Sequence, residues 1–328
     1  MPNPIRQDIH VNRPLTNISV AYMQKESAFV ADKVFPVVPV KKQSDRYFTY
    51  LKEDWFRDEA MKRVHGAESA GGGYELDNTP NYFCEIWAYH KDVTASDRAN
   101  SDTPLSADRD ASEFIAQKFL IKREVEWATR FFATNLWTYD WTGAAAADAA
   151  AYKFVYWSTA GSTPIKDIAE RQIAIQSVTG FKPNVLVLGP YVFMQLRNHA
   201  AILDRIKYTQ RGVVTTELLA ALFDVDKVLV AEGVLNSAAK GATESTDFIM
   251  GKNALLAYAA PRPGLKIPTA GYIFAWTGLE GAGAYGNRIY KLNMDWLGLG
   301  TQRVEGEMAF DAKLVAADLG CFFSGIVE

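Results

Sequence analysis

Apolar positions recur at helical spacing over one long segment, between Asp110 and Thr134. The segment contains no Gly or Pro, and Asp110 followed by Glu113 has the spacing of a capping box at a helix start. A helix of about 24 residues would be about 36 Å long, roughly twice the mean length in globular proteins. Such a helix suits a flat, elongated subunit or the core of an ordinary α+β enzyme. Its predicted apolar face comprises Phe114, Ile121, Val125, Ala128 and Phe132, whereas Lys118, Lys122, Arg123, Glu124 and Glu126 lie elsewhere.

Short apolar runs alternate with helical patterns in the second half of the chain. Strand–helix–strand alternation over residues 180–260 predicts an α/β-like subdomain. The tail, residues 290–327, is predicted to be mostly strands interrupted by glycines. Helices are predicted at 164–179, 191–199, 201–208 and 215–223, and strands at 184–189, 228–231, 254–259 and 272–276.

The first 45 residues do not resemble the start of a compact domain. Five prolines interrupt them, and a proline pushes the preceding residue towards extended backbone. The apolar run FPVVPV at 35–40 contains two of these prolines, which exclude it from a central strand. We expect an extended arm that lies on another surface; the alternative is a disordered tail.

Two strand-like pieces, at 46–58 and 82–93, flank a long glycine-bearing segment. Residues 59–80 include Gly66, the triplet GGG at 71–73 and Pro80, and have few apolar side chains. A structureless loop of this length is unusual inside a compact domain. We therefore expect a projecting arm that contacts a neighbouring copy, and we expect the first hundred residues to gain their order from such copies. Residues 96–102 are interpreted as a solvated turn and residues 141–151 as a flexible connection.

Composition and charge narrow the classes of protein. The chain has 328 residues, of which 48% are apolar and 22% charged, with a net charge of −3. These values exclude a chain disordered throughout, and no basic excess draws it onto nucleic acid. Two cysteines and four histidines exclude a disulfide scaffold and a His-rich metal site. The sequence has neither a membrane-length apolar run nor a signal-peptide pattern at its start, so we expect a soluble protein kept in a reducing cytoplasm.

No motif assigns a catalytic, cofactor-binding or metal-binding residue. The glycines of GAGAYG at 281–286 have dinucleotide-site spacing, but the alternating residues after them predict a strand where that site needs a helix. His10, His65, His90 and His199 lack metal-ligand spacing, and Cys84 and Cys321 are expected to be buried. There is no GxSxG elbow or P-loop. A Ser-His-Asp combination built by the fold stays open, and we expect no enzyme, no cofactor and no metal.

The order of these segments resembles that of the major capsid proteins of tailed bacteriophages, which have the Hong Kong 97-type fold. Three pieces are similar to one branch of that family: FPVVPV at 35–40, RANSDTPL at 98–105 and KPNVLVLG at 182–189. The resemblance implies an α+β fold with a long spine helix. It implies an N-terminal arm at 1–45, an extended loop at 46–93, a peripheral domain with the spine helix at 94–179, an axial domain at 180–289, and a return to the peripheral domain at 290–328.

The resemblance also implies a function. The chain would be a structural subunit that self-assembles, through hexamers and pentamers, into an icosahedral shell around phage double-stranded DNA. It implies a separate scaffolding protein, a portal, possible decoration proteins, diffuse contact with the packaged DNA, assembly in the host bacterial cytoplasm, and no membrane. Two alternatives stay open: an encapsulin-like bacterial nanocompartment shell protein, and a cytosolic α/β enzyme.

Overall fold

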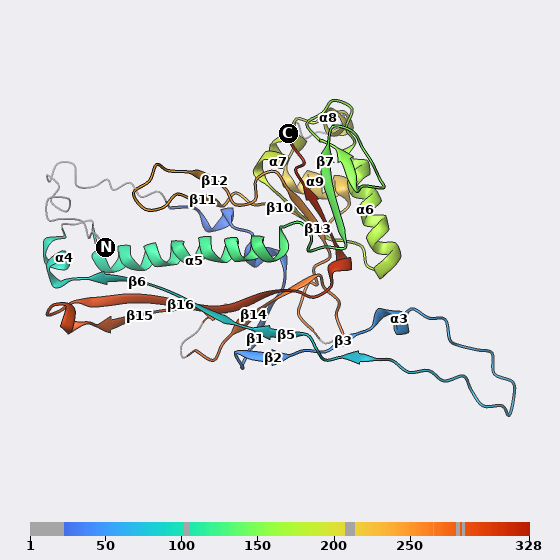
Figure 1. The fold of residues 1–328 in the computed structure, drawn as a ribbon, viewed down its shortest axis with the longest axis horizontal. Coiled ribbons are helices and arrows are strands. Elements are labelled where there is room, and N and C mark those ends of the chain that lie inside the picture. The colour runs from blue at the N-terminus through green and yellow to red at the C-terminus, as the bar shows by residue number, and fades with distance from the viewer. Residues whose placement is uncertain (1–22, 102–104, 207–213, 265, 280–282, 284–285) are drawn as a thin grey trace.

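The chain folds into a compact α/β part at one end and a long helix-covered ribbon at the other. A computed structural model describes residues 23–101, 105–206, 214–264, 266–279, 283 and 286–328. Figure 1 shows the ribbon of strands running beneath one long helix, and a thin two-stranded segment that projects beyond the α/β part. This mixture of helix and sheet confirms the α+β class.

The long predicted helix is present as α5, Ala107–Phe131, but its buried face differs from the predicted one. The N-cap is Ser106, four residues before the predicted N-cap Asp110, and the Asp110–Glu113 capping box does not form. Phe114 is exposed and Val125 is only half-buried. The error arose because one core position is a glutamate, a residue type that periodicity counts as polar. The buried residues are Ala111, Ile115, Glu124, Trp127 and Phe131.

A five-stranded sheet supports α5. Strand β16 is its centre: it pairs antiparallel with β6 along nine residues and with β15 on its other side. Strand β1 pairs in parallel with β14 at the end of the strand order, so Pro39 lies in an edge strand, as predicted. The strands are β1 (Val37–Val40), β6 (Glu85–Val93), β14 (Gly271–Trp276), β15 (Arg288–Asn293) and β16 (Gln302–Leu314).

The α/β part is built on a six-stranded sheet of order β10-β9-β13-β17-β7-β8. The predicted helices and strands of this part are confirmed within the described residues, and residues 207–208, the end of the predicted helix 201–208, lie outside them. Its strands are β7 (Tyr139–Ala144), β8 (Lys153–Val155), β9 (Val185–Leu188), β10 (Lys227–Val230), β13 (Ala254–Ala257) and β17 (Gly320–Ser324). Its helices are α6 (Pro164–Thr179), α7 (Pro190–Arg197), α8 (Ala200–Ile206) and α9 (Thr216–Phe223).

The expected flexible connection at 141–151 is wrong in its first part. Residues 141–144 belong to β7, which pairs in parallel with β17 near the C-terminus, and the Trp141 side chain is buried. Tertiary pairing over long range imposes a strand on this small-residue segment, where local propensity favours a loop. The sequence placed residues 139–179 with the peripheral domain. They instead contribute the strands β7 and β8 to the six-stranded sheet, together with helix α6 of the α/β part.

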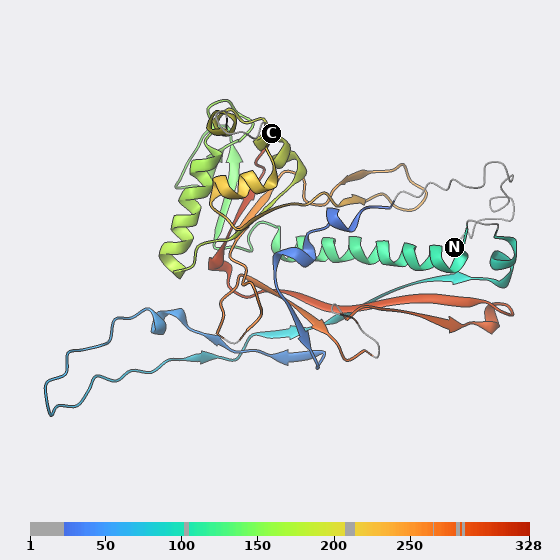
Figure 2. The same ribbon diagram turned by 180° about the vertical axis from the view of Figure 1, so that it is seen from behind.

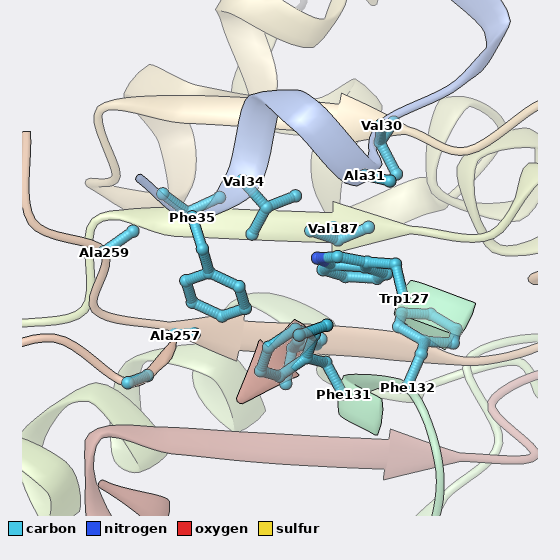
Figure 3. Close-up of a cluster of buried hydrophobic side chains, with 14 of the residues drawn as sticks. Val30, Ala31, Val34, Phe35, Trp127, Phe131, Phe132, Val187, Ala257 and Ala259 are labelled. Carbon is cyan, nitrogen blue, oxygen red and sulfur yellow. The ribbon is translucent and has the colours of Figure 1, made fainter. Parts of the chain in front are cut away.

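The N-terminal arm is docked in the chain's own core. Residues 29–35 include the short helix α2 (Ala31–Val34), preceded by the 3-10 turn η2 (Glu26–Ala28). Phe35 packs on Phe131 with ring centroids 4.6 Å apart and also stacks near Trp127 (Figure 3). The expectation that neighbouring copies order this part of the arm is therefore wrong, because its apolar side chains are buried within the same chain. Residues 1–22 lie outside the described residues.

Residues 44–83 form the projecting segment, which Figures 1 and 2 show from both sides. At its base, β2 (Ser44–Arg46) pairs with β5 (Asn81–Phe83), and β3 (Thr49–Tyr50) pairs with β4 (Leu76–Asp77). A strand followed by a charged segment was expected at 46–58: the strand is present only as β3 and the last residue of β2, and residues 52–55 of the charged part form the short helix α3 (Lys52–Trp55). Residues 56–75 contain no regular element and are exposed, which confirms the expected projection.

Smaller elements surround α5. The expected turn at 96–102 is wrong over 96–100, because these residues belong to α4 (Ala95–Asn100), which Thr94 and Asp97 cap reciprocally; residue 102 lies outside the described residues. The hairpin of β11 (Val234–Asn236) and β12 (Thr246–Phe248) extends beside α5 (Figure 1). Short 3-10 turns are η3 (Asp295–Leu297) and η4 (Ala317–Leu319). None of the helices in the described part of the chain is long and apolar enough to span a membrane.

Candidate functional site

The fold brings one serine and one histidine together. Ser162 Oγ lies 3.0 Å from His199 Nε2, and both residues are buried. His199 Nδ1 accepts a hydrogen bond from the Ala201 N–H, so the proton of the neutral ring is on Nε2 and is donated to Ser162. The Ser162 hydroxyl in turn donates to the Thr159 carbonyl at 2.8 Å. A nucleophilic serine must instead donate to an unprotonated histidine nitrogen. The pair is therefore arranged as a structural tie between two loops.

Electrostatics agree with a structural role for His199. Burial lowers the pKa of its ring, which keeps the ring neutral at physiological pH. The partner of its Nδ1, where a catalytic triad would place a carboxylate, is the backbone N–H of Ala201. The nearby Asp167 carboxylate accepts instead from the Trp157 indole N–H at 2.9 Å.

The two cysteines have the environment of inert thiols. Both are buried and free, as expected. Burial raises the pKa of the Cys84 thiol to about 12, and burial also raises that of Cys321. A thiolate is the nucleophilic form, so neither sulfur is activated at neutral pH.

The remaining candidates are dispersed. His10 lies outside the described residues, His65 is exposed on the projecting segment, and His90 is half-buried on β6. Within the described residues, no group of three or more His, Cys, Asp or Glu side chains could hold a metal ion. The glycines 281–286 lie between β14 and β15, and the element that follows them is a strand rather than a helix. The predicted strand after the motif is confirmed as β15, and within the motif the structure describes only Gly283 and Gly286.

Exposed apolar side chains gather on the projecting segment. Met61 has an exposed fraction of 80%, although it lies in a part of the chain with no regular element. Large apolar side chains exposed together on one projection indicate a protein contact surface. Besides Met61, the exposed large apolar residues here are Phe48, Leu51, Trp55, Phe56, Val64, Tyr74, Leu76 and Phe83.

The base of this segment is fixed to the body of the same chain. The rings of Tyr50, Trp55 and Tyr74 lie with centroids 5.7–5.8 Å apart. The Lys266 ammonium lies 5.2 Å from the centre of the Tyr50 ring, a cation–π distance. Lys52 also forms an ion pair with Asp318. The segment is therefore fixed to the body at its base, whereas the side chains of its distal part are exposed.

A second exposed apolar group occupies the turn between β15 and β16. Trp296 has an exposed fraction of 76% and Leu299 of 90%, with exposed Leu297 between them. In Figures 1 and 2 this turn and the tip of the projecting segment lie at opposite ends of the molecule. This turn was not predicted to be a contact surface, although the run WLGLG at 296–300 combines large apolar residues with turn-forming glycines.

Two curated proteins resemble the chain in sequence. The major capsid protein of Pseudomonas phage JBD67 is 28% identical over 322 residues, which cover 97% of each chain. The major capsid protein of Burkholderia phage BcepMu is 25% identical over 248 residues, or 76% of each. No family model matches the sequence.

Solved structures share the fold along nearly the whole chain. A phage-related protein from Bordetella bronchiseptica superposes with a TM-score of 0.66 at 20% identity, covering 92% of this chain and 94% of that one. The capsid protein of cyanophage P-SCSP1u gives a TM-score of 0.58 at 11% identity and covers 98% of both chains. An encapsulin from Synechococcus elongatus gives 0.59 at 11% identity, covering 96% and 94%.

The chain therefore has the Hong Kong 97-type capsid fold, which phage capsids and encapsulins share. Within this class, its relatives in sequence are phage major capsid proteins, and the resemblance to the tailed-phage major capsid proteins is confirmed.

Proposed function

We propose that the chain is the major capsid protein of a tailed phage, whose copies assemble into the icosahedral shell that encloses double-stranded DNA. The observation that carries this proposal is similarity to a phage major capsid protein over 97% of the chain. The exposed apolar projection and the exposed apolar turn at the opposite end supply the contact surfaces that a shell of identical copies needs.

Electron microscopy of the purified full chain under assembly conditions tests the proposal. Rings or closed shells are the expected result, with light scattering as the quantitative measure of their size. A protein that remains a compact monomer at all concentrations, salts and temperatures that support assembly of related capsids would refute it.

The parts of the fold suggest roles for the segments. We assign residues 1–45 to the N-terminal arm, 46–93 to the extended loop, and α5 to the spine helix. The axial domain comprises the six-stranded sheet with its helices. The peripheral domain comprises α5 with β14, β15 and β16, and the strands β1 of the arm and β6 of the extended loop pair with it. These assignments follow the sheets, so the axial domain takes in residues 139–179 and β17 in addition to much of 180–289.

Several partners belong to the proposal. They are a separate scaffolding protein, a portal and, in some shells, decoration proteins. The packaged DNA is contacted diffusely, because the net charge of −3 provides no overall basic excess. Assembly takes place in the host bacterial cytoplasm. Co-expression with the neighbouring phage genes, followed by mass spectrometry of purified particles, identifies which of these proteins join the shell.

The second candidate function is an encapsulin-like nanocompartment. The observation that favours it is the structural similarity to an encapsulin. The contents of purified particles discriminate the two functions: a high ratio of absorbance at 260 nm to that at 280 nm indicates packaged DNA, whereas a co-purifying enzyme indicates a compartment. A cytosolic α/β enzyme is the weakest candidate, and stoichiometric labelling of Ser162 by a serine-directed probe would revive it.

A further inference from the structure

A carboxylate lies in the core where the arm meets the long helix. Glu124, on α5, has an exposed fraction of 0%. Its carboxylate accepts hydrogen bonds from the N–H of Val30 at 3.0 Å and from the N–H of Ala31 at 2.9 Å. Val30 and Ala31 belong to the apolar cluster in which side chains of the arm pack with Trp127 and Phe131 of α5 (Figure 3).

These hydrogen bonds satisfy the start of α2. The first N–H groups of a helix have no partner within the helix and need one when they are buried. The residue that precedes α2 is Val30, which cannot cap it, and α2 has no side-chain cap of its own. Glu124 supplies the missing acceptor from a residue 93 positions further along the chain.

Charged side chains lie near the Glu124 carboxylate, whose hydrogen-bond donors are backbone N–H groups. On α2, Asp32 lies 3.6 Å from Arg123, the neighbour of Glu124 on α5. Lys33 donates to the Phe29 carbonyl at 2.7 Å, and Lys227 on β10 donates to the Lys33 carbonyl. Lys122 pairs with Glu126 at 2.5 Å on α5. Lys33, Lys122 and Lys227 are thus directed to acceptors other than Glu124.

We propose that Glu124 is the anchor that holds the arm, residues 23–40, on α5, and that loss of its proton weakens this hold. The bonded geometry requires an acceptor oxygen at this position, and its complete burial makes the ionised form of the carboxyl group costly. The arm is then docked most firmly in acid and less firmly in alkaline solution.

The direction of the effect follows from proton linkage. Burial raises the pKa of Glu124 to about 7, from 4.5, against the opposing effect of the Ala31 and Val30 hydrogen bonds. Asp32 raises it further, and Arg123 lowers it. Between these two values the docked state binds more protons than the released state. The stabilisation of the docked arm by protonated Glu124 is therefore complete below about pH 4.5, and it is lost as the pH rises through about 7.

Hydrogen exchange of the purified full chain tests the anchor. Protection factors for peptides covering residues 29–35, corrected for intrinsic exchange, are compared at pH 5.5 and 8.5. In the wild type we expect protection to fall on the order of tenfold between these values. The variant Glu124→Gln keeps the shape but not the titration, and its protection should not change with pH. Glu126→Gln, on the same helix, is the matched control and should behave as the wild type does.

Two results would overturn the proposal: wild-type protection that is equal at both pH values, or the same fall in Glu124→Gln as in the wild type. If Glu124→Gln does not fold, the carbon-13 signal of the Glu124 carboxyl group in the wild type decides. A midpoint near pH 7 supports the anchor, and one near 4.5 overturns it. None of these measurements depends on shell assembly, so they can fail while the proposed function stands.

Discussion

Gly306 lies on β16 directly beneath α5, where it permits the helix to approach the sheet closely. A Cβ at this position would lie 2.5 Å from Ile115 Cγ2 and 2.6 Å from Phe119 Cε2. Both distances are below the van der Waals contact of carbon atoms. A side chain here would therefore push α5 away from the strand.

Gly306→Val should destabilise the subunit by about 1–3 kcal/mol, the usual cost of overpacking a core. Thermal unfolding followed by circular dichroism measures the effect as a lower Tm. Gly73→Val is the control, because Gly73 has open space around it, and it should leave the Tm nearly unchanged. Equal Tm values for both variants would show that α5 does not rest on Gly306.

The burial of Glu124 could not be predicted from the sequence. Charged residues are rarely buried without a partner, so a glutamate within a helix is normally assigned to the solvent side. Its partners are backbone N–H groups 93 and 94 positions away, and no local pattern indicates them. The buried face of α5 could therefore be predicted only in part.

At the scale of elements, local signals decided which predictions were confirmed. Helix α6 begins at Pro164 and ends before Gly180, which has a left-handed backbone with φ of 75°; both signals are readable in the sequence. Strand β7 has no such local signal. It forms by pairing with β17, which is about 180 residues away along the chain. Helix α4 did carry one, the Thr94–Asp97 capping box, but aspartate in place of the usual glutamate made it easy to overlook.

The distal part of the projecting segment should be removable without loss of the fold. A Cβ on Gly72 would lie 2.5 Å from a Glu59 carboxylate oxygen, so the two sides of the segment are close together there. Replacing residues 60–71 by a short Gly-Ser linker should keep the circular dichroism spectrum and lower the Tm by only a few degrees, since residues 60–71 contribute nothing to the buried clusters.

Assembly of this deletion variant should be strongly reduced, with few or no shells in electron micrographs. The control variant Met61→Ser with Val64→Ser keeps the length of the segment but removes two exposed apolar side chains, and an intermediate yield is expected from it. Shells formed by the deletion variant at wild-type yield would show that the distal segment is not an assembly surface. An unfolded deletion variant would show that it is part of the core.

At the scale of the whole molecule, we propose that the two exposed apolar groups mediate different contacts during assembly. They lie at opposite ends of the elongated subunit (Figure 1). A contact between different surfaces of identical copies extends an assembly, and it closes into a shell when the rotation between copies allows. Two separate surfaces therefore permit two kinds of contact per subunit, whereas the docked arm and the two large cores stabilise the subunit itself.

The double variant Trp296→Ser with Leu299→Ser tests this division. Both side chains are largely exposed, so we expect the Tm to change little, in line with substitutions at surface positions. If the turn between β15 and β16 mediates one contact and the projecting segment another, the double variant should stop at small oligomers, whereas the deletion of residues 60–71 should stop at a different size. Sedimentation velocity resolves these species. The same product from both variants would mean that the two ends of the subunit serve a single contact.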